Sequence, residues 1–456
     1  MSKKDGVNPG QKSDRDAIFA KDRTYMWHHM TPFNPNPLIV AEGQGSWITD
    51  IDGNRYLDGM SGLWCVNIGY GREELAEAAY EQMKKMPYYP LVQSHVPAIE
   101  LAAKISEWLD GEYRIVFSNS GSEANEVAFK IIRQYYHSQG QTNRYKVISR
   151  YRAYHGSSMG ALAATGQSIR KLTYEPLVPG FLHVPPPYCY RCPFGKSYGS
   201  CNLECAEVFD EVINWEGEES VGAVIMEPAI TGGGVIVPPP EYLPRVQEIC
   251  ENRGVLLHID EVICGAGRSG RKFGHQNFGV KPDVVTMAKG FTSGYLPLSA
   301  TAVKADIADT FMGGAANQHF RHINTFGGNP AACALALTNL NLIEEEGLIQ
   351  RAEQLGMEMS SKLSALADHP HVGDVRCFGF LAGVELVEDR ETKEPASPGK
   401  VTQVMGECKK RGLIIGKNGD TTPGFNNVLT ISPPFCTTSE EIDFIVRVLQ
   451  ESLETL

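Results

Sequence analysis

Residues 255–294 read VLLHIDEVICGAGRSGRKFGHQNFGVKPDVVTMAKGFTSG, and this stretch decides the fold. It contains two short apolar runs, VLLHI at 255–259 and DVVTM at 283–287, and a polar or glycine-rich turn follows each of them. Short apolar runs bounded by turn residues are typical of strands that are buried on both faces of a sheet. We therefore expect two strands of a parallel sheet here, each with a turn at its carboxyl end.

The same pattern recurs upstream of this stretch. RIVF at 114–117, KVIS at 146–149 and VGAVIM at 221–226 are short, largely apolar runs, and turns and helical patterns follow them. Strands that alternate with helices indicate an α/β fold, in which a mainly parallel sheet is covered by helices on both faces. We predict that this sheet forms the large domain of the chain.

The two ends of the chain show a different pattern. Residues 45–59, GSWITDIDGNRYLDG, read as two strands joined at Asp52-Gly53, a pair that favours a hairpin turn. Near the other end, helical patterns cover 331–366 and 397–412, and the strand-like stretch VGDVRCFGFLAGVELV lies between them. We predict a smaller α+β domain built from both termini. The predicted domains are a large one over residues 76–328 and a small one from residues 1–75 and 329–456.

The composition excludes several classes of protein. The chain has 456 residues, of which 42% are hydrophobic and 21% charged, so it has enough apolar material for a sizeable core. Its formal net charge of −12 argues against a nucleic-acid partner, which needs a basic surface. Its apolar stretches are far shorter than the roughly 20 residues of a membrane helix, and its first residues lack the apolar core of a secretory signal. The 11 scattered cysteines fit a reducing compartment, and we expect a cytoplasmic protein.

Polar residues that can carry chemistry follow the predicted strands. Ligands of open α/β sheets bind at the carboxyl ends of the strands, so we expect these residues to meet at one edge. Pyridoxal phosphate needs a phosphate cradle, a flat group against its ring, an anion at its ring nitrogen and a lysine that forms an imine. The strand ends present all four, and the sequence therefore predicts a site for this cofactor. In chain order they carry Ser120-Gly121-Ser122, Tyr154-His155-Gly156, Glu227, Asp260 and Lys289.

Each of these residues also has a simpler interpretation. The Ser-Gly-Ser stretch precedes a helix expected near Glu123, where N–H groups bind phosphate, but a serine there also caps helices that bind nothing. Asp260 suits the ring nitrogen, yet a lone aspartate after a strand is more often a helix cap or an ion-pair partner. Lys289 otherwise extends along the sheet edge to water, and Tyr154 otherwise belongs to the core. The cofactor interpretation rests on all of them lying at the same edge.

The whole pattern resembles the class III, omega-type, pyridoxal-phosphate-dependent aminotransferases. The motifs that carry the resemblance span nearly the whole chain: DGMSGLWCVNIGYG, SNSGSEANEVAFK, YHG, MEPAITGGGVIVPP, HIDEVICGAGRSG, PDVVTMAKG, HINTFGGNPAACA and GDVRCFGFLAGVEL. The resemblance implies fold type I with pyridoxal 5′-phosphate as cofactor. It also implies a ping-pong reaction, in which an amine donor and then a keto acid acceptor use the same site.

The same resemblance implies a role for each site residue. Lys289 resembles the lysine that binds the cofactor covalently and moves the proton, and Asp260 resembles the partner of the pyridine nitrogen. Val262 and Tyr154 resemble the residues on opposite faces of the ring. Thr325, in NTFGGNP, resembles a threonine that reaches the phosphate of the neighbouring subunit, which implies a homodimer with shared sites and leaves tetramers open. The phosphate loop and the other implied cofactor-binding positions are Ser120, Gly121, Ser122, His155 and Glu227.

The donor pocket shows one departure from the family. Trp64, in GLWCVN, and Tyr154 resemble its aromatic walls, with core packing as the alternative for Trp64. Many relatives bind the substrate carboxylate through an arginine near the C-terminus, in a GLI-x-R or an R-I-x-P-P context. Here these stretches read GLIIGKNGD and LTISPPF, so Gly416 or Lys417, and Thr430, stand where the arginines are often found.

This departure leaves several cations open as partners of the substrate anion. We predict Lys417 as a substrate residue, with Arg170 or Arg376 as alternatives, although a structural role in the small domain suits Arg376 better. The stretches NGDTTPGFNNV and LWCVNIGYG most resemble taurine–pyruvate aminotransferases. We therefore predict an ω-amino acid or amine donor, such as taurine or β-alanine, and pyruvate as acceptor. The alternatives are an aminomutase or a transaminating decarboxylase of the same fold, or a binding protein without activity, which Lys289 argues against.

Four cysteines gather in the stretch PYCYRCPFGKSYGSCNLECAE. Cysteine pairs at such spacing hold zinc in some proteins and iron–sulfur clusters in others. The loop between the pairs is short for a zinc ribbon, and relatives carry similar YRCPFG loops for which we expect no metal. We therefore predict no metal site, and metal analysis of the isolated protein is the test. The four are Cys189, Cys192, Cys201 and Cys205.

Overall fold

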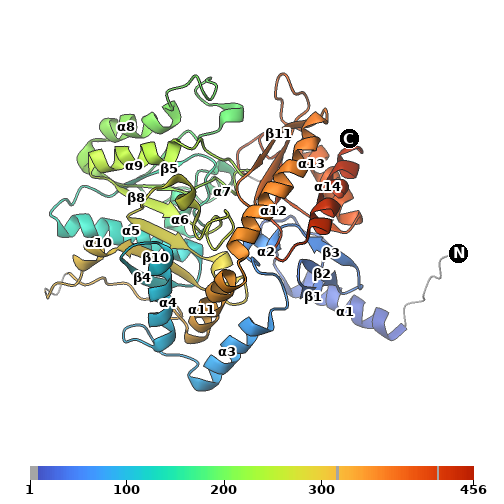
Figure 1. The fold of residues 1–456 in the computed structure, drawn as a ribbon, viewed down its shortest axis with the longest axis horizontal. Coiled ribbons are helices and arrows are strands. Elements are labelled where there is room, and N and C mark those ends of the chain that lie inside the picture. The colour runs from blue at the N-terminus through green and yellow to red at the C-terminus, as the bar shows by residue number, and fades with distance from the viewer. Residues whose placement is uncertain (1–8, 315–317, 419–420) are drawn as a thin grey trace.

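The computed structural model describes residues 9–314, 318–418 and 421–456. Figure 1 shows a central sheet with helices around it, and beside it the N-terminal and C-terminal segments, which lie together at one side of the molecule. None of the described helices is long and apolar enough to span a membrane.

The large sheet has seven strands, and it confirms the predicted α/β fold with a mainly parallel sheet. Only one strand, β10, runs antiparallel to its neighbours on both sides within the described residues. The β8 strand reaches one residue further than the sequence indicated, so that Asp260 ends the strand instead of following it. In spatial order the strands are β4 (Tyr113–Ser118), β10 (Ser299–Lys304), β9 (Val284–Met287), β8 (Leu256–Asp260), β7 (Val221–Met226), β5 (Lys146–Arg150) and β6 (Phe181–Val184).

Helices cover both faces of this sheet, because its strands are apolar on both sides. In β7, Val224 and Met226 pack into a cluster with α8 and α9, while Ala223 and Ile225 pack into a second cluster with α5. Successive residues of a strand point to opposite faces, so an unbroken apolar run such as β7 needs cover on both. The helices of this part are α5 (Gly121–Ser138), α6 (Met159–Ala164), α7 (Ser168–Lys171), α8 (Glu204–Glu216), α9 (Tyr242–Arg253) and α10 (Ala305–Asp309).

The terminal segments form two smaller sheets. The expected hairpin is confirmed, because β2 pairs antiparallel with β3 and Gly53 in the turn between them has a φ of 81°. The parallel pairing of β3 with β13 then joins the N-terminal to the C-terminal segment. One sheet has the order β1 (Val40–Gln44), β2 (Trp47–Asp50), β3 (Arg55–Asp58), β13 (Leu413–Ile414), and the other β11 (Val372–Cys377), β12 (Ala382–Leu386), β15 (Val428–Ile431), β14 (Gly416–Lys417).

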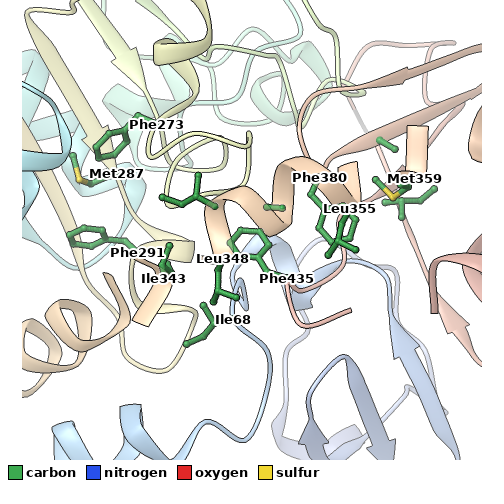
Figure 2. Close-up of a cluster of buried hydrophobic side chains, with 14 of the residues drawn as sticks. Ile68, Phe273, Met287, Phe291, Ile343, Leu348, Leu355, Met359, Phe380 and Phe435 are labelled. Atoms are coloured by element: carbon green, nitrogen blue, oxygen red, sulfur yellow. The ribbon is translucent and has the colours of Figure 1, made fainter. Parts of the chain in front are cut away.

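One apolar core connects the large sheet with the terminal segments. Figure 2 shows Phe273 and Phe291 on the side of the large sheet and Phe380 and Met359 on the side of the C-terminal segments, all within one buried cluster. The predicted boundary at residue 76 falls inside α3, and the division into two domains stays a prediction. The remaining helices are α1 (Pro9–Tyr25), α2 (Ser61–Trp64), α3 (Glu73–Lys85), α4 (Val96–Trp108), α11 (Pro330–Glu345), α12 (Leu348–Leu363), α13 (Pro398–Lys410) and α14 (Ser439–Leu453).

Candidate active site

A cavity of about 430 Å³ lies at the carboxyl edge of the large sheet. Turns that follow β4, β5, β7, β8 and β9 contribute to its wall. The carboxyl ends of these strands therefore meet at one edge, as the sequence predicts. The predicted site residues that line it are Ser120, Gly121, Ser122, Tyr154, His155, Glu227, Asp260, Val262 and Lys289.

Lys289 provides a buried amine in this cavity. It follows β9 after one residue and begins the short 3₁₀ helix η4 (Lys289–Thr292), with a φ of 51° that directs the chain sharply away from the sheet. Burial lowers the pKa of its ammonium below the ordinary value of 10.5, because the charged form loses its hydration. The amine is therefore more often unprotonated than a surface lysine, which is the form that attacks a carbonyl carbon.

Asp260 provides a buried anion. One of its oxygens, Oδ2, accepts hydrogen bonds from Nδ1 of His155 at 2.8 Å and from Nδ2 of Asn125 at 2.9 Å. The other oxygen, Oδ1, accepts the backbone N–H of Val262 at 3.1 Å. Burial alone would raise the pKa of this carboxyl group, but the bonds from His155 and Asn125 outweigh it, and the pKa is lowered. Asp260 thus stays negatively charged although it is only 3% exposed.

Asn125 is a residue that the sequence reasoning missed. Besides its bond to Asp260, its Nδ2 donates to the carbonyl oxygen of His155 at 2.6 Å, and its Oδ1 accepts the hydroxyl of Thr286 at 2.8 Å. It therefore fixes the orientation of the Asp260 carboxylate from the side of α5. The sequence did contain a signal, because Asn125 is a polar residue at a position where the helical pattern favours an apolar one. In the structure Asn125 is wholly buried, as are Ala124 and Val127 of the same helix.

The Ser-Gly-Ser stretch forms the start of α5, which begins at Gly121 and not near Glu123. The hydroxyl of Ser120 accepts the N–H of Glu123 at 3.3 Å, and the Glu123 carboxylate accepts the N–H of Ser120 at 3.1 Å. The helix-cap interpretation of Ser120 therefore holds. The first N–H groups of a helix have no partner within it, so those of Gly121 and Ser122 face the cavity as donors for an anion.

Close packing around this helix start requires glycine at two positions. A Cβ on Gly121 would come within 2.9 Å of Cγ2 of Val262, and a Cβ on Gly156 within 2.5 Å of Oγ of Ser122. Both glycines keep the backbone near the cavity free of side chains. A phosphate can approach a backbone of this kind closely.

The residues present fit pyridoxal phosphate. The helix start offers N–H donors for the phosphate, Asp260 offers a fixed anion for the ring nitrogen, and Lys289 offers a buried amine. In addition, Nε2 of His155 is buried and has no hydrogen-bond partner among the described residues. An orphaned buried nitrogen is costly unless a ligand or water satisfies it, so it favours a polar group in the cavity.

Glu227 and Tyr154 act as a pair. Glu227 accepts the backbone N–H of Tyr154 at 3.1 Å through Oε1, and through Oε2 it accepts the N–H and the hydroxyl of Thr231 at 3.1 and 2.9 Å. Burial raises the pKa of the Glu227 carboxyl group. Glu227 thus ties the turn that carries Tyr154 to the end of β7 and sets the position of the aromatic wall.

Three predicted residues lie outside the cavity lining. Thr325 is exposed, and Trp64 is half-buried with its ring centroid 5.8 Å from Nζ of Lys289. Lys417 is exposed, and the structure does not bring it to the cavity, so the prediction of Lys417 as a substrate residue has no support in the geometry. Arg376 is held by Asp374 and Glu385 at 2.6 and 2.9 Å, as expected of a structural residue.

The positions of the arginines found in many relatives are closed. Gly416 of β14 and Thr430 of β15 are cross-strand partners, so the two sequence positions lie side by side in the fold. A Cβ on Gly416 would come within 2.6 Å of both Cε of Met60 and Oγ1 of Thr430. A side chain directed from Gly416 towards these neighbours therefore requires Met60 and Thr430 to move, so this space is filled in the present chain.

The four cysteines of the 187–207 stretch lie together. Cys189, Cys192, Cys201 and Cys205 line one small cavity, and all are free thiols. Burial, with the neighbouring thiols as a further cause, raises the pKa of Cys205 to about 12. Within the described ranges, no group of three or more histidine, cysteine or acidic side chains has an arrangement that could hold a metal ion.

Comparisons with known proteins give a consistent result. The family model "Aminotransferase class-III" matches residues 30–453. The chain is 58% identical to "Uncharacterized aminotransferase YhxA" of Bacillus subtilis (strain 168), over 96% of each protein. It is 42% identical to "Taurine--pyruvate aminotransferase" of Bilophila wadsworthia (strain 3_1_6), over 97% of this chain and 98% of that protein. A solved structure of a Bacillus anthracis aminotransferase is 54% identical, with a TM-score of 0.96 over 99% of this chain and 100% of that chain.

Proposed function

The chain belongs to the class III aminotransferases, which use pyridoxal 5′-phosphate, and on that premise we propose that its donor is an ω-amino acid or amine such as taurine or β-alanine, with pyruvate as acceptor. The observation that carries the donor class is the closed position at Gly416, where a carboxylate-binding arginine stands in many relatives. A donor whose anion lies further from its amine does not need an arginine at that place. The 42% identity to a taurine–pyruvate aminotransferase supports the same donor class.

Lys289 and Asp260 carry the chemistry in this proposal. When bound, pyridoxal phosphate supplies an aldehyde carbon that bonds to amines and a ring that withdraws electrons. Asp260 would place its negative charge at the ring nitrogen, and its bonds to His155 and Asn125 fix the carboxylate for that role. Lys289 would hold the cofactor, and once a donor amine had replaced it there, its free amine Nζ would be the base that accepts the proton from the donor carbon and the acid that returns it. The keto acid runs the same steps in reverse, so the kinetics are ping-pong.

A homodimer is part of the proposal. Thr325 is exposed and lies outside the cavity lining of its own chain, which suits a residue that reaches the phosphate in a neighbouring subunit. Exposed apolar side chains lie close by in the sequence, with Ile323 67% and Phe326 62% exposed. A subunit interface over this segment would bury them. A tetramer built from two such dimers, and a cytoplasmic location, are consistent with the proposal.

A donor panel with pyruvate tests the proposed function. Purified holoenzyme is mixed with pyruvate and taurine, β-alanine or a simple amine, and the alanine formed is measured. We expect alanine with at least one ω-amino acid. An aminomutase would need no external acceptor, and a decarboxylase would release carbon dioxide. If no donor of the panel yields alanine, the assignment is wrong.

A further inference from the structure

An ω-amino acid brings a negative charge into the active site that needs a partner. Transfer of a sulfonate or carboxylate from water into the protein is strongly disfavoured unless a cation or several hydrogen-bond donors meet it there. Gly416 offers no such partner, and Lys417 is exposed and away from the cavity lining. A different cation has to meet this charge if the proposed function is correct.

Arg170 lies beside the wall that faces the donor. It belongs to the short helix α7, and its guanidinium carbon lies 5.0 Å from the ring centroid of Tyr154. Tyr154 in turn lines the cavity. The positive charge of Arg170 also reaches Lys289, since it is one of the causes that lower the pKa of that amine, after burial as the main cause. Arg170 therefore lies next to a residue that lines the cavity, on the side of Tyr154.

The guanidinium of Arg170 is held in place but has no anion. Its Nε donates to Oε1 of Gln167 at 2.6 Å, and Gln167 is itself wholly buried and donates to the carbonyl of Arg152 at 3.0 Å. Its Nη1 contacts the sulfur of Met30 at 3.2 Å, and a thioether is a weak acceptor. Among the described residues, the partners of the Arg170 guanidinium are Gln167, Met30 and the ring of Tyr154, and none of them is a carboxylate.

Two other half-buried arginines, Arg376 and Arg191, differ from Arg170 in this respect. Arg376 and Arg191 share the buried carboxylate of Glu385, at 2.9 and 2.5 Å. A half-buried guanidinium that is oriented by a fixed glutamine and lacks a counter-charge is prepared to receive an anion. Three N–H groups of its planar fork remain, one on Nη1 and two on Nη2, and Nη1 and Nη2 together match two oxygens of a sulfonate or a carboxylate.

We propose that Arg170 binds the sulfonate or carboxylate of the ω-amino acid donor across the ring of Tyr154. This inference rests on the proposed function, because it names the residue that selects that donor class. It also assigns to α7 the part that a C-terminal arginine plays in many relatives. Neutral amines of the same length do not use this contact.

The test compares anionic and neutral donors in holoenzyme variants. Arg170→Met and Arg170→Lys are compared with the wild type and with Arg271→Met, a matched control whose arginine pairs with Glu353 on the surface. Taurine, β-alanine and propylamine are each mixed with holoenzyme in the absence of a keto acid, and the spectral change of the first half-reaction is followed. Binding of isethionate, which has the sulfonate but no amine, is measured by calorimetry.

We expect Arg170→Met to raise the half-saturating concentration of taurine and β-alanine about 10- to 100-fold. This is the loss of affinity expected when charge-assisted hydrogen bonds to the donor anion are removed. The maximal rate and all propylamine values should change less than about threefold, and isethionate should lose the same factor of affinity as taurine. Arg170→Lys should recover part of the loss, because it keeps the charge without the fork. Arg271→Met should behave as wild type.

Two results overturn the inference. Equal losses for propylamine and taurine would mean that Arg170 supports the position of Tyr154 and does not bind the anion. Unchanged values for all donors and for isethionate would mean that it does neither. If the wild type rejects taurine, β-alanine and propylamine alike, the proposed function fails, and isethionate binding still decides whether Arg170 forms an anion site.

Discussion

The two ends of the active-site cavity are built differently. At the cofactor end, Asp260 and His155 are buried at the sheet edge, Lys289 is half-buried in the same cavity, and hydrogen bonds fix the acid and the imidazole. At the donor end, outside the cavity lining itself, Arg170 and Trp64 come from short helices outside the sheet and have few partners. This difference indicates that the residues for the chemistry shared by the family lie on the rigid edge of the sheet. The choice of donor depends on segments that can change without disturbing that edge.

Removal of the lysine should have the largest effect, because it breaks the cofactor end. We expect Lys289→Ala to lower turnover by at least about 1,000-fold, since the covalent link and the proton carrier are lost together. Turnover is measured as alanine formed, and the covalent link as the absorbance that borohydride changes. Lys281→Ala, at an exposed lysine, is the control and should be unaffected. Near-normal turnover of Lys289→Ala would contradict the assignment.

The next largest effect concerns the anion at the same end. Asp260→Asn keeps the shape of the side chain but removes the charge, and we expect turnover to fall about 100-fold while the cofactor stays bound. The control is Asp210→Asn, because Asp210 pairs with Arg253 on the surface, where such pairs contribute about 0–1 kcal/mol. Equal turnover of both variants would mean that the charge of Asp260 has no part in the reaction.

A smaller effect should follow from crowding the phosphate cradle. Gly121→Ala places a Cβ within 2.9 Å of Val262, and overpacking of this kind costs about 1–3 kcal/mol. We expect the affinity of the apoenzyme for pyridoxal phosphate to fall roughly tenfold, which corresponds to about 1.4 kcal/mol.

The matched control for this substitution is Gly406→Ala. Gly406 lies in α13, and a Cβ there would meet no heavy atom within 4 Å. Alanine should therefore raise the free energy of unfolding by about 0.5–1 kcal/mol and leave cofactor affinity unchanged. If Gly121→Ala and Gly406→Ala lower cofactor affinity equally, Gly121 has no specific role in the phosphate cradle.

The last prediction concerns stability and not turnover, and it tests how well the cofactor end excludes water. His258 lies two residues before Asp260, is wholly buried, and burial lowers its pKa from the ordinary 6.5 to about 3. As the pH falls, the imidazole of His258 takes up a proton at a higher pH in the unfolded chain than in the folded protein. The free energy of unfolding should therefore fall as the pH drops below 6.5, by up to about 1.4 kcal/mol per pH unit. Urea denaturation of wild type and His258→Gln at several pH values measures the slope. The variant should show a shallower slope, and identical slopes would contradict a buried neutral imidazole.

The cofactor end could be predicted from the sequence because its signals are local. Asp260 and Lys289 each follow a short apolar run, and parallel strands bring their carboxyl ends to one edge. Asn125 escaped the prediction because it lies inside a helix and not after a strand. Its position opposite Asp260 depends on how α5 packs across the sheet, which a single sequence does not state.

The donor end was harder to predict because it is assembled from distant segments. The geometry gives the prediction of Lys417 no support, since neighbouring residues of a strand point to opposite sides: Gly416 faces Met60, and Lys417 faces water. The space beside Gly416 is filled by Met60, which lies more than three hundred residues earlier in the chain. Only the folded structure shows that this space is closed and that Arg170 lacks a counter-charge.

Transfer of a labelled nitrogen tests the account most directly. Wild-type holoenzyme is incubated with ¹⁵N-taurine or ¹⁵N-β-alanine and unlabelled pyruvate, and the alanine is analysed by mass spectrometry. The account predicts alanine that carries the label, in an amount equal to the donor consumed, and no label in alanine formed by Lys289→Ala. Donor consumption with no labelled alanine, or label that appears equally with Lys289→Ala, would contradict it.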